Sequence, residues 1–140
     1  MELFSLRYLV VEDHAFQRDM LKETLLALGA HSVHCAGNGA QALAVLRDPG
    51  RPVDIVISDL MMPEVDGIEL IPLLRQAANR ISLILTSADA WSLRAAEEIA
   101  KGHGVTLLGA VAKPMTAEKM VPLLQLYLAQ RAAENPVAPR

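Results

Sequence analysis

Four short apolar runs in the sequence each lead to a polar residue whose side chain could take part in chemistry. The first is followed by the acidic pair Glu12 and Asp13, the second ends at Asp59, the third ends at Thr86, and the fourth is followed by Lys113. In a parallel α/β sheet the carboxyl ends of the strands lie on one edge, where such folds place their chemistry. We therefore expect three carboxylates, a hydroxyl and an ammonium to surround one small volume.

These residue types together favour a bound divalent cation. Carboxylates at about 4 Å repel by roughly 4 kcal/mol per pair at an effective dielectric of about 20, so the site needs a divalent cation. Oxygen-only ligands in an open site favour Mg²⁺, with Glu12, Asp13 and Asp59 as ligands. The cation and the Lys113 ammonium would together offset the negative charge of the three carboxylates.

The elements that must position these residues alternate along the chain. Apolar runs predict five strands, and apolar residues three and four apart predict five helices. Strands joined through helices give right-handed crossovers and a parallel sheet covered on both faces. The expected strands are residues 8–11, 33–35, 53–58, 82–85 and 106–111, and the expected helices are 16–28, 40–47, 68–77, 91–101 and 117–131.

Glycine, asparagine and proline mark the ends and irregularities of these helices. Gly29 is expected to cap the first helix at its carboxyl end, and Asn38-Gly39 to form a turn before the second. Pro72 and Pro122 fall inside predicted helices, where proline lacks a backbone donor. We expect a kink or a late start at each.

Length and composition indicate one domain. The 140 residues, 52% of them apolar, can build one ordinary core. We expect a compact domain over residues 1–131 and a linker or disordered tail over 132–140. A net charge of -3 and a pI near 5.8 argue against direct nucleic-acid binding. Cys35 is the only cysteine, which fits a reducing cytoplasm, and no apolar run is long enough to span a membrane.

Four sequence blocks together resemble the signature of a known family. The blocks are Val10-Val11-Glu12-Asp13-His14, Ser58-Asp59-Leu60-Met61-Met62-Pro63-Glu64-Val65-Asp66-Gly67, Thr86-Ser87-Ala88 and Ala112-Lys113-Pro114. In this order they are similar to the CheY-like receiver domain of two-component response regulators, and the resemblance runs from Tyr8 to about Arg131. It implies an α/β fold of the flavodoxin-like, doubly wound type, with a five-stranded parallel sheet in the order 2-1-3-4-5 and five helices.

The resemblance also implies roles and partners. Asp59 would be the nucleophile that accepts a phosphoryl group from a sensor histidine kinase or phosphotransfer protein, while Mg²⁺ and the Lys113 ammonium neutralise the developing charge. The domain would then switch conformation to control an output. Thr86, Ser87 and Lys113 would contact the phosphoryl group, and the carbonyl of Met61 would be a further metal ligand. The Lys113-Pro114 peptide is expected to be cis. A homodimer and a following output domain are left open.

Two departures from the commonest receiver pattern concern the stretch between Thr86 and Lys113. It holds 26 residues, a few more than usual for the family. Its sequence is similar to the same segment of receivers that precede cyclic-di-GMP phosphodiesterase domains. Ala110 stands where many receivers carry a switching Tyr or Phe. We therefore expect a readout through residues 87–110 and the last helix without an aromatic rotamer flip.

Two other function classes compete with the active receiver. A Mg²⁺-dependent aspartyl-phosphate hydrolase of the haloacid dehalogenase type would need a second acid two residues after Asp59, where Met61 stands. A phosphorylation-independent interaction domain on the same fold would lack some of the acidic, threonine or lysine set, and here the set is complete. We expect no enzyme activity beyond the chain's own phosphorylation and dephosphorylation.

Overall fold

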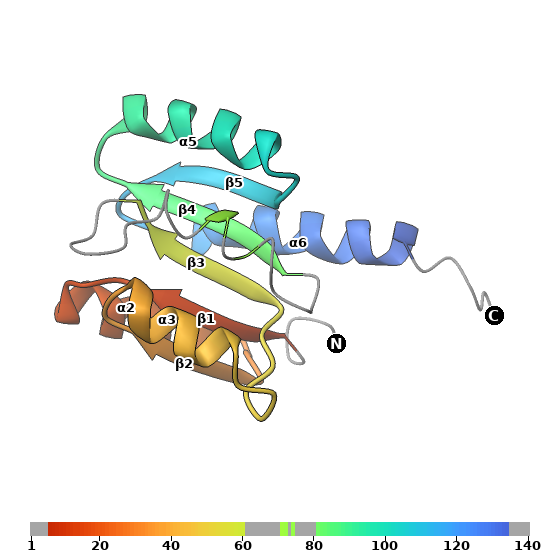
Figure 1. Ribbon diagram of the computed structural model, residues 1–140. Helices are drawn as coiled ribbons and strands as arrows, with labels where there is room; N and C mark the ends of the chain where they lie inside the picture. The colour runs from red at the N-terminus through yellow and green to blue at the C-terminus, as the bar shows by residue number, and fades with distance from the viewer. Residues whose placement is uncertain (1–5, 61–70, 73, 75–80, 135–140) are drawn as a thin grey trace.

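Strands and helices alternate along the chain, as the apolar pattern predicts. The computed structural model describes residues 6–60, 71, 72, 74 and 81–134 (Figure 1). Each bound lies within two residues of its prediction, except that the last helix continues three residues further. The strands are β1 (Arg7–Val11), β2 (Ser32–Ala36), β3 (Ile55–Asp59), β4 (Ser82–Ser87) and β5 (Thr106–Ala112), and the helices are α2 (Ala15–Ala27), α3 (Gly39–Leu46), α5 (Ala90–Gly102) and α6 (Ala117–Glu134).

The five strands form one parallel sheet in the order β2-β1-β3-β4-β5, so the predicted doubly wound topology is confirmed. The register pairs Asp59 with Thr86 and Ser87 with Ala112, which brings the ends of β3, β4 and β5 level with one another. The register of β4 with β5 shifts between Leu83 and Ile84, so that Leu108 of β5 has no partner in β4. The polar residues that follow the strands therefore meet at one edge.

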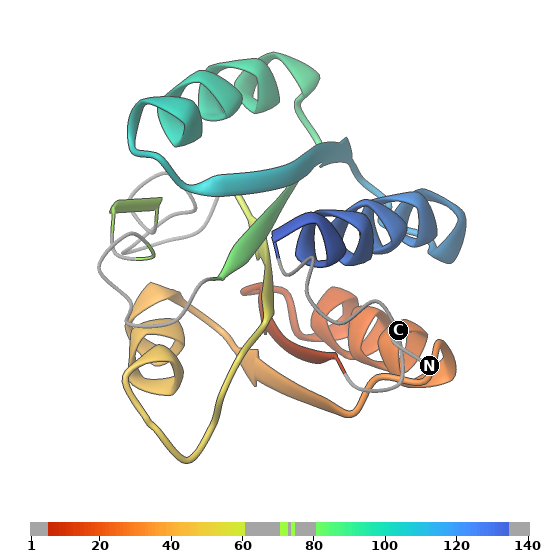
Figure 2. The same cartoon turned by 90° about the vertical axis from the view of Figure 1, so that its right-hand side faces the viewer.

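Helices cover both faces of this sheet. Figure 2 shows α2 and α6 on one side and α3 and α5 on the other. Alternate residues of the central strands enter two separate cores: Val10 and Ile57 pack under α2 and α6, whereas Val11 and Val56 pack under α3 and α5. Burial on both faces explains why these strands read as continuous apolar runs.

Local hydrogen bonds end α2 and begin α3 where the sequence predicts. Gly29 has a φ of 92°, and the N–H groups of Gly29 and Ala30 donate to carbonyls of the last turn of α2, at 3.0 and 3.1 Å. This is the left-handed cap that glycine favours. Asn38 Oδ1 accepts from the N–H of Gln41 at 2.8 Å, and Gln41 Oε1 accepts from Gly37 N at 2.7 Å. Asn38 thus acts as the N-cap of α3.

Two expectations about helices have different outcomes. The third predicted helix, residues 68–77, lies mostly outside the described residues, although Ile71 and Leu74 within it are buried in the core under α3 and α5. Of the kink or late start expected at Pro122, the late start is excluded, since α6 begins at Ala117 and continues through Pro122, and the kink stays a prediction. None of the helices in the described part of the chain is both long and apolar enough to cross a membrane.

An ion pair joins β1 and β3 at the edge opposite to the strand ends that carry the polar residues. Arg7 Nε and Nη2 donate to the two carboxylate oxygens of Asp54, each at 3.0 Å, and the Arg7 backbone N–H donates to the same carboxylate at 2.9 Å. Asp54 N donates in turn to the Arg7 carbonyl at 2.8 Å. The two-point contact has the geometry of the stronger kind of arginine–carboxylate pair.

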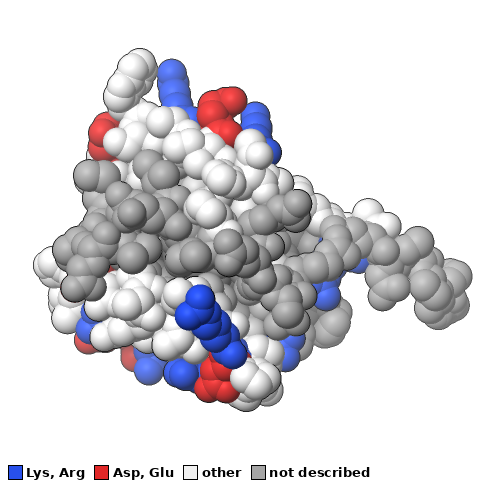
Figure 3. Space-filling view, in the orientation of Figure 1, with Lys and Arg blue, Asp and Glu red and all other residues white. Residues whose placement is uncertain are grey.

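Charged side chains of both signs lie next to each other on the face in Figure 3. On α5, Lys101 Nζ lies 3.8 Å from Glu98 Oε2, and both side chains are at least three-quarters exposed. Such exposed pairs contribute little to stability.

Candidate functional site

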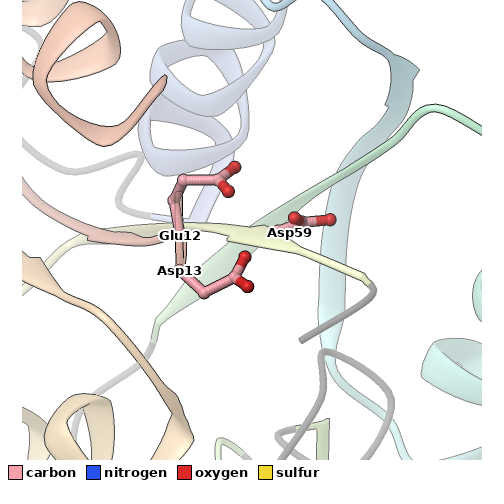
Figure 4. Close-up of side chains that lie close together, drawn as sticks. All are labelled: Glu12, Asp13 and Asp59. Atoms are coloured by element: carbon pink, nitrogen blue, oxygen red, sulfur yellow. The ribbon is translucent and has the colours of Figure 1, made fainter. Parts of the chain in front are cut away.

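Three carboxylates meet at the carboxyl edge of the sheet (Figure 4). Glu12 and Asp13 follow β1 directly, and Asp59 is the last residue of the neighbouring strand β3. One carboxylate oxygen from each lies within 4.8 Å of the others. Glu12 and Asp59 are buried, whereas Asp13 is exposed. The predicted acidic cluster is therefore present in the structure.

Lys113 reaches the same point from β5, across β4. Its Nζ donates to Glu12 Oε1 and to Asp59 Oδ2, each at 2.9 Å. The Lys113–Pro114 peptide is cis, as expected from the resemblance. The ammonium thus bridges the two buried acids.

Burial and nearby charges shift the pKa of Glu12 and of Lys113. Burial raises the pKa of Glu12, and the nearby charge of Asp59 adds to this, while hydrogen bonds from Lys113 and from the His14 N–H act in the opposite direction. Burial by itself lowers the pKa of Lys113, but its hydrogen bonds to Glu12 and Asp59 outweigh that effect and raise it. Lys113 therefore stays charged at neutral pH. Three carboxylates facing one ammonium leave two formal negative charges, which is the charge a divalent cation balances.

Thr86 and Ser87, at the end of β4, stand between Asp59 and Lys113. Both residues are buried. The Thr86 carbonyl accepts from the N–H of Leu60 at 2.8 Å, and the Ser87 carbonyl accepts from the N–H of Lys113 at 2.9 Å. Ser87 Oγ accepts from the N–H of Asp89 at 3.0 Å, so this hydroxyl also shapes the turn into α5. Met61, the remaining predicted ligand, lies outside the described residues.

Three residues not predicted from the sequence also contact the site. Gln17 Oε1 accepts from Lys113 Nζ at 2.7 Å, and Arg18 Nη1 donates to the Glu12 carbonyl at 3.0 Å. Lys119, in the first turn of α6, donates from Nζ to the carbonyls of Ala112 and Pro114, each at 2.9 Å. Because α2 begins two residues after Asp13, polar residues of its first turn could have been proposed as neighbours of the site.

A pocket of about 420 Å³ opens beside the carboxylates, between α2 and the segment after β5. Its apolar wall includes Phe16 and Met20, which are 67% and 54% exposed. Met20 is thus exposed to solvent, whereas Met120 is fully buried in the core under α2 and α6. The lining residues are Glu12, Phe16, Gln17, Met20, Leu21, Thr24, Thr86, Ala88, Lys113, Pro114 and Met115.

Comparison with known proteins gives a consistent match. The family model for the response regulator receiver domain matches residues 8–125. A probable chemotaxis protein CheY from Rhizobium etli is 31% identical over 116 residues, which are 83% of this chain and 87% of that protein. The solved structure of Vibrio cholerae chemotaxis protein CheY4 has a TM-score of 0.74 at 26% identity and covers 87% of this chain and 98% of its own.

A longer relative matches over nearly the whole chain. The cyclic di-GMP phosphodiesterase RocR from Pseudomonas aeruginosa is 33% identical over 128 residues, which are 91% of this chain but 32% of RocR. A probable transcriptional regulatory protein from Picosynechococcus matches over 35% of its length. The chain thus corresponds to about a third of these two relatives.

Proposed function

The chain belongs to the response regulator receiver family and is a CheY-like domain of two-component signalling, and on this premise we propose that Asp59 accepts a phosphoryl group from a histidine kinase. The observation that carries the proposal is the position of Asp59. It is a buried carboxylate at a strand end, with the Lys113 ammonium at 2.9 Å and two further acids within 4.8 Å.

The chemistry requires positioning and charge neutralisation more than covalent help. An Asp59 oxygen forms a bond to phosphorus while the bond from phosphorus to the donor breaks, and the leaving group keeps the electron pair. The Lys113 ammonium stabilises the charge that develops on the phosphoryl oxygens. Thr86, level with Asp59 on the next strand, would donate its hydroxyl to one of them, and the Ser87 backbone N–H to another.

The carboxylate cluster also suits Mg²⁺. Its donors are all oxygen, they lie within 4.8 Å of one another, and they leave two formal negative charges after pairing with Lys113. Glu12, Asp13 and Asp59 would hold the ion, and the carbonyl of Met61 stays a predicted ligand. When bound, Mg²⁺ would neutralise charge on both the carboxylates and the phosphoryl group.

The pocket along α2 suits a protein phosphodonor. Phe16 and Met20 present exposed apolar surface, and Glu12, Thr86 and Lys113 lie in the same pocket. A helix from a kinase or phosphotransfer protein that packs on this apolar wall would bring its phosphohistidine to Asp59. Replacing Phe16 and Met20 with serine should slow phosphorylation by such a partner but leave labelling by acetyl phosphate unchanged.

We propose that this chain acts in the cytoplasm and catalyses no reaction other than its own phosphorylation and dephosphorylation. The activity that it controls would then belong to another domain or protein. The similarity of this chain to RocR supports a cyclic-di-GMP phosphodiesterase as the kind of output that phosphorylation controls.

Labelling with acetyl phosphate tests the assignment of Asp59. Intact-mass spectrometry should find one added phosphoryl group in the wild type with Mg²⁺, and none in Asp59→Asn or in the presence of a chelator. Asp19→Asn, at an exposed position on α2, is the matched control and should label normally. Equal labelling of Asp59→Asn, or labelling unaffected by the chelator, would overturn the proposal.

A further inference from the structure

The Lys113 ammonium has as many acceptors as protons among the described residues. It donates to Glu12 Oε1 and Asp59 Oδ2, each at 2.9 Å, and to Gln17 Oε1 at 2.7 Å. A lysine has three N–H donors, so each proton has an oxygen partner. Two partners are carboxylates of the site, and the third is the neutral carboxamide of Gln17 in the first turn of α2.

The backbone that carries Lys113 is fixed by other contacts. Its N–H donates to the Ser87 carbonyl at 2.9 Å, and Lys119 Nζ donates to the carbonyls on either side, those of Ala112 and Pro114. What these bonds leave undetermined is the four-carbon side chain, whose tip has many accessible rotamers. The three acceptors therefore decide where the ammonium points.

Phosphorylation changes only one of these acceptors. When Asp59 forms its bond to phosphorus, its carboxylate becomes an uncharged acyl group and the negative charge lies on the phosphoryl oxygens. The hydrogen bond from Lys113 to Asp59 loses its charge assistance, and that proton has a better acceptor in a phosphoryl oxygen. The carboxylate of Glu12 and the carboxamide of Gln17 are chemically unchanged by the step.

We propose that Gln17 is a positioning residue for Lys113. Together with Glu12 it holds two of the ammonium protons, so that the third follows the charge from Asp59 to the phosphoryl group. This role rests on the proposed function of Asp59 but assigns a contribution to a residue outside the acidic, threonine and lysine set.

The first test compares the replacement of glutamine by methionine at two positions. Gln17→Met keeps the length of the side chain but removes the acceptor, and it should slow phosphorylation by phosphoramidate with Mg²⁺ about threefold to tenfold, as for the loss of one partly exposed hydrogen bond to a charged group. Gln125→Met makes the same change at an exposed position on α6. It should leave the rate within about twofold of wild type if only site contacts matter.

A double-mutant cycle separates positioning from other roles. In a Lys113→Met background, with labelling followed for long enough to record its slower rate, adding Gln17→Met should have no further effect. A wild-type rate for Gln17→Met, or the same slowing in both backgrounds, would refute the role. Absence of labelling in the wild type would instead overturn the assignment of Asp59 itself.

Discussion

Replacing Lys113 with methionine should expose the repulsion that its ammonium offsets. Oxygens of Glu12 and Asp59 lie within 4.8 Å of each other, and both side chains are only 7% exposed. Two unit charges at this distance repel by roughly 3 kcal/mol at an effective dielectric of about 20. The variant should therefore lose about 2–3 kcal/mol of unfolding free energy at neutral pH without Mg²⁺, since proton uptake by one carboxyl relieves part of the repulsion.

Urea denaturation followed by circular dichroism measures this loss. Lys101→Met is the matched control because it removes an exposed lysine from a pair at 3.8 Å, and it should be indistinguishable from wild type. Adding Asp59→Asn to Lys113→Met should restore most of the stability by removing one of the two facing charges. At acid pH, where the carboxyls are protonated, the gap to wild type should narrow.

Two results would refute this reasoning. Wild-type stability of Lys113→Met at neutral pH would mean that the ammonium does not offset a buried repulsion. Failure of Asp59→Asn to restore stability in that background would mean that the loss comes from packing of the lysine stem instead.

Three further predictions concern the core, the acidic cluster and the readout. Gly109→Ala would place a Cβ 2.8 Å from a methyl of Leu123 and should cost about 1–3 kcal/mol, whereas Gly102→Ala meets nothing within 4 Å and should be neutral or stabilising, both checked by urea denaturation. Burial raises the pKa of Glu12, so the folded state holds this proton more tightly than the unfolded chain does. The protonated carboxyl therefore adds stability that is complete below the unfolded pKa and is lost as pH rises through the folded pKa. Glu12→Gln should remove this fall in unfolding free energy with rising pH, measured without Mg²⁺. Beryllofluoride should change amide exchange within residues 87–110, and changes confined to the loop after Asp59 would contradict the proposed readout.

The strand ends and the sheet topology were predictable because a strand buried on both faces of the sheet has a continuous apolar run in its sequence. Apolar runs stop where the backbone leaves the sheet, so Asp59 and Thr86 could be placed on one edge before their register was known. Lys113 could be added because it stands just after the fifth predicted strand, residues 106–111.

The contacts of long side chains were not predictable in the same way. Gln17 and Lys113 are 96 residues apart, and Arg7 and Asp54 are 47 apart. Whether two such groups meet depends on their side-chain rotamers and on the distance between the helix and the strand that carry them. Neither can be predicted from the spacing of residues along the sequence. The register shift between Leu83 and Ile84 likewise has no signal in the alternation of residues.

The pair of Arg7 and Asp54 separates two requirements of the domain. Its side-chain and backbone bonds fasten the beginnings of β1 and β3, while the acids that carry the chemistry follow the other ends of these strands. The amino edge therefore acts as an anchor for the two central strands that carry the acids. Substitutions of Asp54 would accordingly weaken the attachment of β1 to β3 without changing the residues that carry the chemistry.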